Sequence, residues 1–319
     1  MKLDLLNALG LLLALGVATL GAGLRYHEAA PLPPGAAPGA LATLVESLPD
    51  GTPALRDARS VLVPLRAYRR IASGTLIADR VLVDLCEPDR IVAFTRYAEK
   101  TPSAHRYAGK PVLGARDDVE RVLALKPELL FVNDLVDQNY VARLREHGVQ
   151  VFDLGPMRGL VSLLPNIRAI GVLIGAPERA ARYAEQLQER LRKVALEEAE
   201  LPHPRALYLS SYGDKLFASG ADTSYHDVLA YAGLRDAAAL AGLSGWPELS
   251  GERVLALDPD VLVTRTGMGP LLCRHPGLDQ LRVCRGQGRL VELDGALLDD
   301  PGPALLEAAE ALHSTYWRR

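Results

Sequence analysis

The 319-residue sequence predicts an α/β protein with two lobes, each built on a parallel sheet and joined to the other by a single long helix. Three observations lead to this prediction: a segment that occurs twice, strand and helix patterns that alternate in both halves, and a long amphipathic stretch between them. The two copies read RVLALKPELLFV at 121–132 and RVLALDPDVLVT at 253–264, 132 residues further along. That distance exceeds the roughly 20–50 residues of a solenoid repeat and suits two similar halves of small-domain size.

Each copy of the repeat has the pattern of a helix, a proline turn and a buried strand. In the first copy, Val122, Leu123 and Leu125 have helical spacing, and Pro127 ends the helix because it has no N–H group to donate. The apolar run at 129–132 then has the length of a buried strand. A helix followed by a buried strand is typical of a parallel α/β sheet.

Similar patterns predict the other elements, and their alternation favours βαβ units. Residues 60–65 are expected to form an edge hairpin or strand that leads into the first core strand. Core strands are expected at 71–73, 90–94, 129–133, 149–154, 205–209, 260–264 and 289–292, and helices at 76–86, 119–125, 141–147, 225–231, 253–257, 278–281 and 305–317.

Two further helices are predicted between the halves, at 160–174 and 177–198. The second begins at Pro177, where proline is tolerated, and about 22 residues at 1.5 Å each span roughly 33 Å, enough to bridge two lobes. The chain is therefore expected to divide into a linker and pre-domain segment (25–59), an N-terminal lobe (60–155), connecting helices (156–200) and a C-terminal lobe (201–319).

The N-terminal segment 1–24 is expected to be a signal peptide or a membrane anchor. The apolar run at 5–24, interrupted by Asn7, is long enough to span a bilayer and is longer than a usual signal-peptide core. Its four glycines and the small residues at 21–23 favour cleavage. A buried soluble helix is the third interpretation. Signal peptide and anchor both place the rest of the protein outside the cytoplasm, and no nearby cysteine offers a lipoprotein anchor.

The composition excludes several classes of function. With 49% hydrophobic and 24% charged residues the chain is globular, and a net charge of −3 gives no basic footprint for nucleic acid. The seven histidines lack the paired spacing of a metal site, so no metal site is expected. The nucleophile elbow, the Walker loop and the dinucleotide fingerprint are absent from the sequence, so we do not expect an enzyme, and an extracytoplasmic hydrolase finds no support.

The three cysteines permit one disulfide bond. Cys273 and Cys284 lie eleven residues apart in a loop-rich stretch, and an oxidising compartment allows them to pair. The alternative is two independent small residues. Pairing would leave Cys86 as a buried thiol.

Several segments together resemble the periplasmic binding proteins of ABC importers for iron-siderophores, haem and cobalamin. The resemblance extends from about residue 60 to residue 317, and the order and spacing of the segments carry it rather than any single motif. The segments are YRRIAS (68–73), DRIVA (89–93), LALKPEL (123–129), DVLAYAG (227–233), GWPELSGE (245–252) and PD (259–260).

The resemblance implies two Rossmann-like lobes joined by one backbone helix, with the ligand between the lobes at the carboxyl ends of the strands. It implies an extracytoplasmic, monomeric substrate-binding subunit that captures a metal chelate and delivers it to an ABC permease and its ATPase. No cofactor is expected besides this ligand, which would be a ferric siderophore, haem or cobalamin. The alternative is a membrane-anchored sensor or scaffold that uses the same fold without transport.

Residues that follow the predicted strands are the candidate ligand contacts. They are Arg96 and Tyr97, Tyr212, and Arg265, with Trp246 from a loop before a proline. Aromatic rings would stack on a flat chelate, and arginines would pair with its carboxylates. Surface ion pairs for the arginines and simple packing for the aromatics are the alternatives.

Two aspartates are candidates for docking to the permease. In the resembled family an acidic residue on the first helix of a lobe pairs with permease arginines. Asp79 is the nearest acid here, although Arg80 stands where the acid often lies, and Asp227 opens the corresponding helix of the second half. The alternative is that both carboxylates stabilise helix N-termini.

Overall fold

The computed structural model describes residues 45–98, 104–113, 119–196, 202–298, 302 and 304–317, and these belong to one compact unit. The predicted signal peptide or anchor at 1–24 and the linker up to residue 44 lie outside the described residues. Among the residues that are described, no helix combines the length and apolar character needed to cross a membrane.

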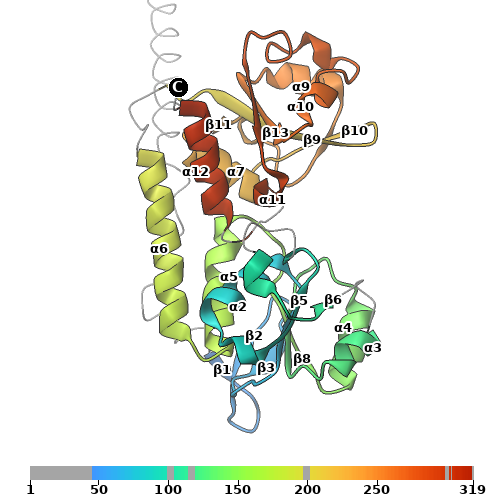
Figure 1. Ribbon diagram of the computed structural model, residues 1–319, viewed down its shortest axis with the longest axis vertical. Helices are drawn as coiled ribbons and strands as arrows, with labels where there is room; N and C mark the ends of the chain where they lie inside the picture. Colours follow the sequence, from blue (N-terminus) through green and yellow to red (C-terminus); the bar gives the residue numbers. More distant parts are fainter. Residues whose placement is uncertain are drawn as a thin grey trace, which may run out of the picture. The chain divides into compact units, whose positions relative to one another are not determined.

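The N-terminal lobe has a five-stranded parallel sheet in the order β6-β5-β4-β7-β8. All four residues of β7 are buried, which explains why its sequence is an unbroken apolar run. Figure 1 shows this sheet with its helices below the second lobe. The strands are β4 (Ile71–Ser73), β5 (Ile91–Thr95), β6 (Val112–Leu113), β7 (Leu129–Val132) and β8 (Gln150–Asp153), and the helices are α2 (Leu76–Leu85), η2 (Pro88–Arg90), η4 (Ala104–Tyr107), α3 (Val119–Ala124) and α4 (Gln138–Glu146).

A separate antiparallel sheet precedes this lobe, with β1 (Val45–Ser47), β2 (Pro53–Arg56) and β3 (Leu62–Pro64). The expected hairpin at 60–65 is present, but β3 pairs with β2 and not with the core sheet. The buried carboxylate of Asp57 explains the difference. It accepts hydrogen bonds within the turn that joins β2 to β3, and it forms an ion pair with Arg145 of the N-terminal lobe.

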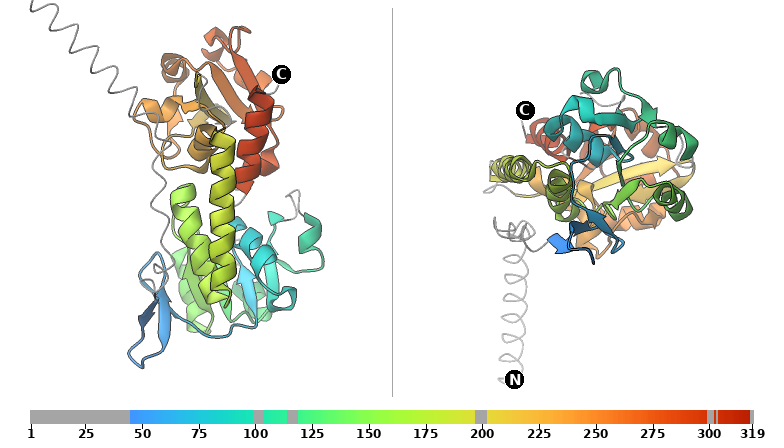
Figure 2. Two further views of the ribbon diagram at one scale, coloured as in Figure 1. Left: turned by 90° about the vertical axis from the view of Figure 1, so that its left-hand side faces the viewer. Right: turned by 90° about the horizontal axis from the view of Figure 1, so that it is seen from below.

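The connecting helices are α5 (Leu160–Leu173) and α6 (Pro177–Leu196). They pack closely because Gly171 has no side chain: a Cβ there would lie 2.1 Å from the Cβ of Ala180. Helix α6 also packs on helices of the C-terminal lobe, and Figure 2 shows it running alongside both lobes. A single long helix therefore joins the two α/β lobes, as the fold class predicted. The lobe limits at residues 60, 155 and 201 stay predictions.

The C-terminal lobe has a mixed sheet. Strands β11, β9, β13 and β14 are parallel, whereas β10 and β12 are antiparallel additions at one side. The helix expected at 278–281 is a short 3₁₀ turn. The strands are β9 (Arg205–Tyr212), β10 (Lys215–Ala218), β11 (Arg235–Asp236), β12 (Glu248–Leu249), β13 (Val261–Arg265) and β14 (Arg289–Leu293), and the helices are α7 (Ser224–Tyr231), α8 (Ala237–Leu240), α9 (Gly251–Leu257), α10 (Gly269–Leu272), η5 (Leu278–Gln280), α11 (Gly295–Leu298) and α12 (Ala304–Trp317).

The duplicated segment has one local structure in both lobes. It forms α3 and β7 in the first copy and α9 and β13 in the second. Lys126 and Asp258, which occupy the same position of the repeat, both take the left-handed backbone conformation, with φ of 47° and 40°. Few side chains adopt this conformation without strain, so the helix ends abruptly at the same place in both copies.

A matching set of hydrogen bonds holds each copy to the neighbouring strand. The carboxylate of Glu128 accepts from the backbone of Arg70, before β4, and the carboxylate of Asp260 accepts from the backbone of Arg205, in β9. The two guanidinium groups donate in turn to the carbonyls of Leu125 and Leu257, each at 2.6 Å. The repeat therefore specifies a helix, a strand and this set of hydrogen bonds between a carboxylate and an arginine. We call the set, Glu128 with Arg70 and Asp260 with Arg205, the lock.

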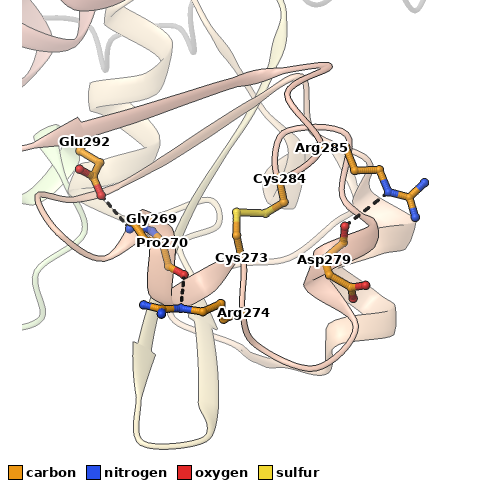
Figure 3. The surroundings of a disulfide bond; sticks show 8 residues. All are labelled: Gly269, Pro270, Cys273, Arg274, Asp279, Cys284, Arg285 and Glu292. Carbon is orange, nitrogen blue, oxygen red and sulfur yellow. Dashed lines mark hydrogen bonds between the residues drawn. A yellow bond between two sulfur atoms is a disulfide. The ribbon is translucent and has the colours of Figure 1, made fainter.

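Cys273 and Cys284 form a disulfide bond between the end of α10 and the turn that follows η5. Figure 3 shows the bridge together with the hydrogen bond from the backbone of Gly269 to Glu292 of β14. Cys86 is a buried free cysteine.

Candidate ligand-binding site

A cavity of about 790 Å³ lies between the two lobes. The ends of β5 and β7 and the start of α2 supply one wall, with Thr95, Asn133 and Thr75. The other wall is supplied by the start of α7 and by Trp246. Ligand pockets have volumes of roughly 300–1,000 Å³ and occur at the carboxyl ends of parallel strands. The cavity is therefore the candidate binding site.

The wall from the C-terminal lobe is aromatic. The rings of Tyr208 and Tyr225 lie 4.0 Å apart, and the Trp246 ring meets that of Tyr225 edge-on at 4.8 Å. The Tyr225 hydroxyl donates to the carbonyl of Leu298, which fixes the ring that supports the indole. Trp246 remains 47% exposed, so it has surface left to stack on a ligand.

The wall from the N-terminal lobe carries positive charge. Arg96 and Tyr97 follow β5 and line the cavity, and the guanidinium of Arg96 lies over the Tyr97 ring, 5.3 Å from its centre. Arg121 of α3 also lines the cavity. No Asp or Glu side chain among the described residues lines it, so this wall favours an anionic group on the ligand.

Asp79 was predicted to dock to the permease, and its position corrects that prediction. It is fully buried in α2, and its carboxylate accepts hydrogen bonds from the backbone and the hydroxyl of Thr95. It therefore fixes the end of β5 immediately before Arg96 and Tyr97. Arg80 is also buried and forms an ion pair with Glu307 of α12, so the middle of α2 contacts the other lobe.

Tyr212 and Arg265 were predicted to contact the ligand, but neither lines the cavity. Strand β9 continues to Tyr212 because β10 pairs with its second half, and the tyrosine is 83% exposed at the hairpin turn. Arg265 ends β13, and its Nε lies 2.8 Å from where a Cβ on Gly295 would be, beside α11. Of the five predicted ligand residues, the structure brings together Arg96, Tyr97 and Trp246.

The expectation that ligand contacts follow strand ends missed lining residues on helices and in loops, among them Arg121, Tyr140, Met157 and Tyr225. Arg121 belongs to the first copy of the repeat, so the sequence held a signal for it. The start of α7 was predicted as a helix, but no sequence pattern indicated that its first turn faces the other lobe. Within the described part of the chain, no cluster of three or more His, Cys, Asp or Glu side chains is placed to hold a metal ion.

Asp227, the second predicted docking residue, also points into the molecule. Its carboxylate accepts a hydrogen bond of 2.7 Å from the backbone of Leu160, the first residue of α5. Burial raises the pKa of this carboxyl group to about 6. The alternative prediction was that Asp227 stabilises the N-terminus of its own helix, α7. The observed contact is with a helix N-terminus, but it is that of α5.

The sequence and the structure both match known binding proteins. Residues 71–286 match the model of the periplasmic binding protein family. The chain is 25% identical over 277 residues to a cobalamin-binding protein of Halobacterium salinarum, covering 81% of this chain and 73% of that protein. It is 22% identical over 202 residues to an uncharacterized ABC transporter substrate-binding lipoprotein of Bacillus subtilis, covering 61% and 63%.

The structure is similar to that of a periplasmic heme-binding protein from Pseudomonas aeruginosa, with a TM-score of 0.66, 27% identity, and coverage of 78% of this chain and 93% of that one. The family match extends from the N-terminal lobe through the connecting helices into the C-terminal lobe. The chain therefore belongs to the periplasmic binding protein family.

Proposed function

We propose that this protein is the extracytoplasmic substrate-binding subunit of an ABC importer and captures a metal chelate. The observation that carries the proposal is the cavity of about 790 Å³, with Tyr225 and Trp246 on one wall and Arg96 and Tyr97 on the other. A cavity with one aromatic and one cationic wall suits a flat ligand with an acidic edge. The relatives named for cobalamin, for heme and for an ABC transporter support the same proposal.

The two walls would act on different parts of the chelate. Trp246 offers an indole for stacking on a macrocycle or an aromatic siderophore arm. Arg96 has no carboxylate partner among the described residues, so its guanidinium is available for a carboxylate of the ligand. If the chelate is haem, the phenol oxygen of Tyr97 is the candidate axial ligand for the iron.

Titration of the purified protein with haemin, cyanocobalamin and ferrichrome tests this function. Trp246 is one of two tryptophans in the chain and lines the cavity, so binding should quench tryptophan fluorescence in a saturable way. We expect at least one probe to bind with a Kd below about 10 µM, which corresponds to a binding free energy of about −7 kcal/mol or stronger. If no probe quenches saturably, and mass spectrometry of protein from its native host finds no chelate, the chelate assignment is wrong.

The partnership with a permease requires its own test, because the positions of Asp79 and Asp227 leave no assigned docking residue. The loaded protein should stimulate the ATPase of an ABC permease from the native host, reconstituted in proteoliposomes. Stimulation by the loaded form supports import. Ligand binding without any stimulation would favour the sensor or scaffold instead.

A further inference from the structure

Two hydroxyl groups, one from each lobe, line the cavity without a bond to the protein. Thr75 precedes α2 in the N-terminal lobe, and Ser224 is the first residue of α7 in the C-terminal lobe. Both line the cavity, although they are only 6% and 8% exposed. Within the described part of the chain neither side-chain oxygen has a hydrogen-bond partner, and neither is sealed from solvent. Because buried polar groups are normally bonded, both hydroxyls are available to a molecule in the cavity.

Thr75 is held rigidly in every part except its hydroxyl. A threonine at the N-cap usually accepts a hydrogen bond from the first turn of its helix, but the side chain of Thr75 forms no such bond. Its carbonyl accepts from the hydroxyl of Ser73 at 2.9 Å and from the N–H of Asp79 at 3.0 Å. Gly74 fits against β7, where a Cβ would lie 2.8 Å from the carbonyl oxygen of Phe131. The fold therefore fixes the backbone and leaves the hydroxyl for a ligand.

The start of α7 shows a threonine whose hydroxyl is used as a cap. The hydroxyl of Thr223 accepts from the N–H of His226 at 3.1 Å and donates to the carbonyl of Gly220 at 2.8 Å. Thr223 does not line the cavity, whereas the next residue, Ser224, does. Helix α7 thus has one hydroxyl for its cap and a second one at the cavity. Helix α2 has a single hydroxyl in this position, and it lines the cavity while the cap bond is absent.

The two hydroxyls add hydrogen-bonding capacity to the cavity without adding charge. The first turns of α2 and α7 contain Asp79 and Asp227, which offset the positive end of each helix. Neither carboxylate lines the cavity. A hydroxyl both donates and accepts, and it bonds charged and uncharged oxygen atoms alike. The hydroxyls therefore differ in kind from the guanidinium of Arg96, which favours an anion.

We propose that Thr75 and Ser224 form a hydrogen-bonding subsite of the cavity that holds acceptor oxygens of the chelate from both lobes. This subsite rests on the proposed function, because it requires a chelate in the cavity. A ligand that bonds both hydroxyls connects α2 to α7 and so connects the two lobes. The chelate therefore carries oxygen groups on two of its edges, such as the carboxylates of haemin or the carboxamides of a corrinoid.

The test uses variants that remove a hydroxyl with little change of shape. Thr75→Val and Ser224→Ala remove the two proposed contacts, and Thr75→Ser keeps the hydroxyl. The matched control is Thr264→Val in β13, because the hydroxyl of Thr264 is buried, lies outside the cavity and donates to the carbonyl of Leu209 at 2.8 Å. Urea unfolding measures stability, and fluorescence titration with haemin, cyanocobalamin and ferrichrome measures affinity.

Stability and affinity should separate between the variants and the control. Thr75→Val and Ser224→Ala should unfold at the same urea concentration as the wild type, because neither hydroxyl bonds the protein. Each should bind the probe that the wild type binds about threefold to tenfold more weakly. Thr75→Ser should bind within about twofold of the wild type. Thr264→Val should unfold at a lower urea concentration and keep its affinity.

The absence of charge gives a second measurement. The loss of affinity in Thr75→Val should be the same at about 50 mM and about 500 mM NaCl, because salt screens charges and leaves uncharged hydrogen bonds unchanged. With haemin the loss should persist for the dimethyl ester, which keeps the carbonyl oxygens but not the charge. A loss that disappears at high salt or with the ester would contradict an uncharged contact and overturn the subsite.

The remaining outcomes separate this subsite from the proposed function. If a probe binds the wild type, Thr75→Val and Ser224→Ala equally well, the subsite is wrong and the function stands. If Thr75→Val loses as much stability as Thr264→Val, its hydroxyl caps α2 and the subsite is wrong as well. If none of the three probes binds the wild type, the proposed function fails and the subsite fails with it.

Discussion

The two copies of the repeated segment have the same backbone and the same lock, but only one of them reaches the ligand cavity. In the N-terminal lobe, Arg121 and Val122 of α3 and Val132 and Asn133 at the end of β7 line the cavity. No residue of α9 or β13 in the second copy does so, and the strand ends with Arg265 beside α11. The repeat therefore specifies the local backbone structure of a helix and a strand. The segments around each copy determine whether that structure lines the ligand cavity.

The segments that follow each copy explain the difference. Between β7 and β8 the chain forms α4, whose Tyr140 is buried against the lobe and lines the cavity. Between β13 and β14 it forms α10, the disulfide-bonded loop and η5, none of which lines the cavity. The C-terminal lobe reaches the ligand instead through α7 and Trp246. As a result the N-terminal lobe supplies the two arginines together with Tyr97 and Tyr140, and the C-terminal lobe supplies Tyr225 and Trp246.

The disulfide bond should give the largest effect on stability, and only the C-terminal lobe has it. Replacing Cys273 and Cys284 by alanine opens a short loop, and closure of a loop of this size is worth about 3 kcal/mol. Urea unfolding should show that loss. Ligand affinity should stay within about twofold, because the loop does not line the cavity. A loss of affinity as large as the loss of stability would show that the loop supports the binding wall.

Removal of the indole tests the aromatic wall of the C-terminal lobe. Trp246→Ala should weaken binding by about 2 kcal/mol, or roughly thirtyfold in Kd, because stacking area and the contact with Tyr225 are both lost. Tyr212→Ala is the matched control, since this tyrosine of the same lobe is 83% exposed and outside the cavity. Difference spectra of the bound chelate measure both. Equal affinities for the two variants would make Trp246 a packing residue.

The two arginines predicted at strand ends, Arg96 and Arg265, distinguish a ligand position from a scaffold position. Arg96→Gln should weaken the binding of haemin by about 1.4 kcal/mol, or tenfold, through loss of a charge-assisted hydrogen bond. The dimethyl ester of haemin, which has no free carboxylate, should bind this variant and the wild type alike. Arg265→Gln should leave both affinities unchanged because its guanidinium lies beside Gly295. A loss with Arg265→Gln alone would reverse the assignment of the walls.

Periodicity predicted the parts of the fold that bury apolar runs, and it failed where pairing depends on distant segments. The runs that became β5, β7 and β13 are buried on both sides, so their sequences indicated strands. Strand β10 and its hairpin were missed, although Gly213 and Asp214 at its turn are residues that favour such turns. Two-residue strands such as β6 are too short to leave any periodic signal.

The candidate site was predictable where a side chain follows a strand that ends at the cavity, or where a proline marks a loop. Arg96 and Tyr97 meet that condition, and the proline after Trp246 indicated a loop. The roles of Asp79 and Asp227 were not predictable, because each depends on a partner distant in sequence, Thr95 in one case and Leu160 in the other. An acid near the start of a helix has the same pattern in a sequence whether it faces solvent, its own helix or another lobe.

The lock shared by both copies should give the smallest effect, and it should depend on pH. The hydrogen bond from the backbone of Arg69 is the main cause that lowers the pKa of Glu128 below 4.5. A lowered pKa means that the charged form stabilises the fold above about pH 4.5 and that this stability is lost as the pH falls through the folded pKa. Glu128→Gln keeps an acceptor but not the charge, so it should cost less than about 1 kcal/mol at pH 7 and almost nothing at pH 3.5. Urea unfolding at both pH values measures this loss of stability.

Asp260→Asn, the same change in the other lobe, should cost more at pH 7 because it also breaks the ion pair with Arg282. Equal costs in both lobes would mean that the repeat, and not its local partners, sets the strength of the lock.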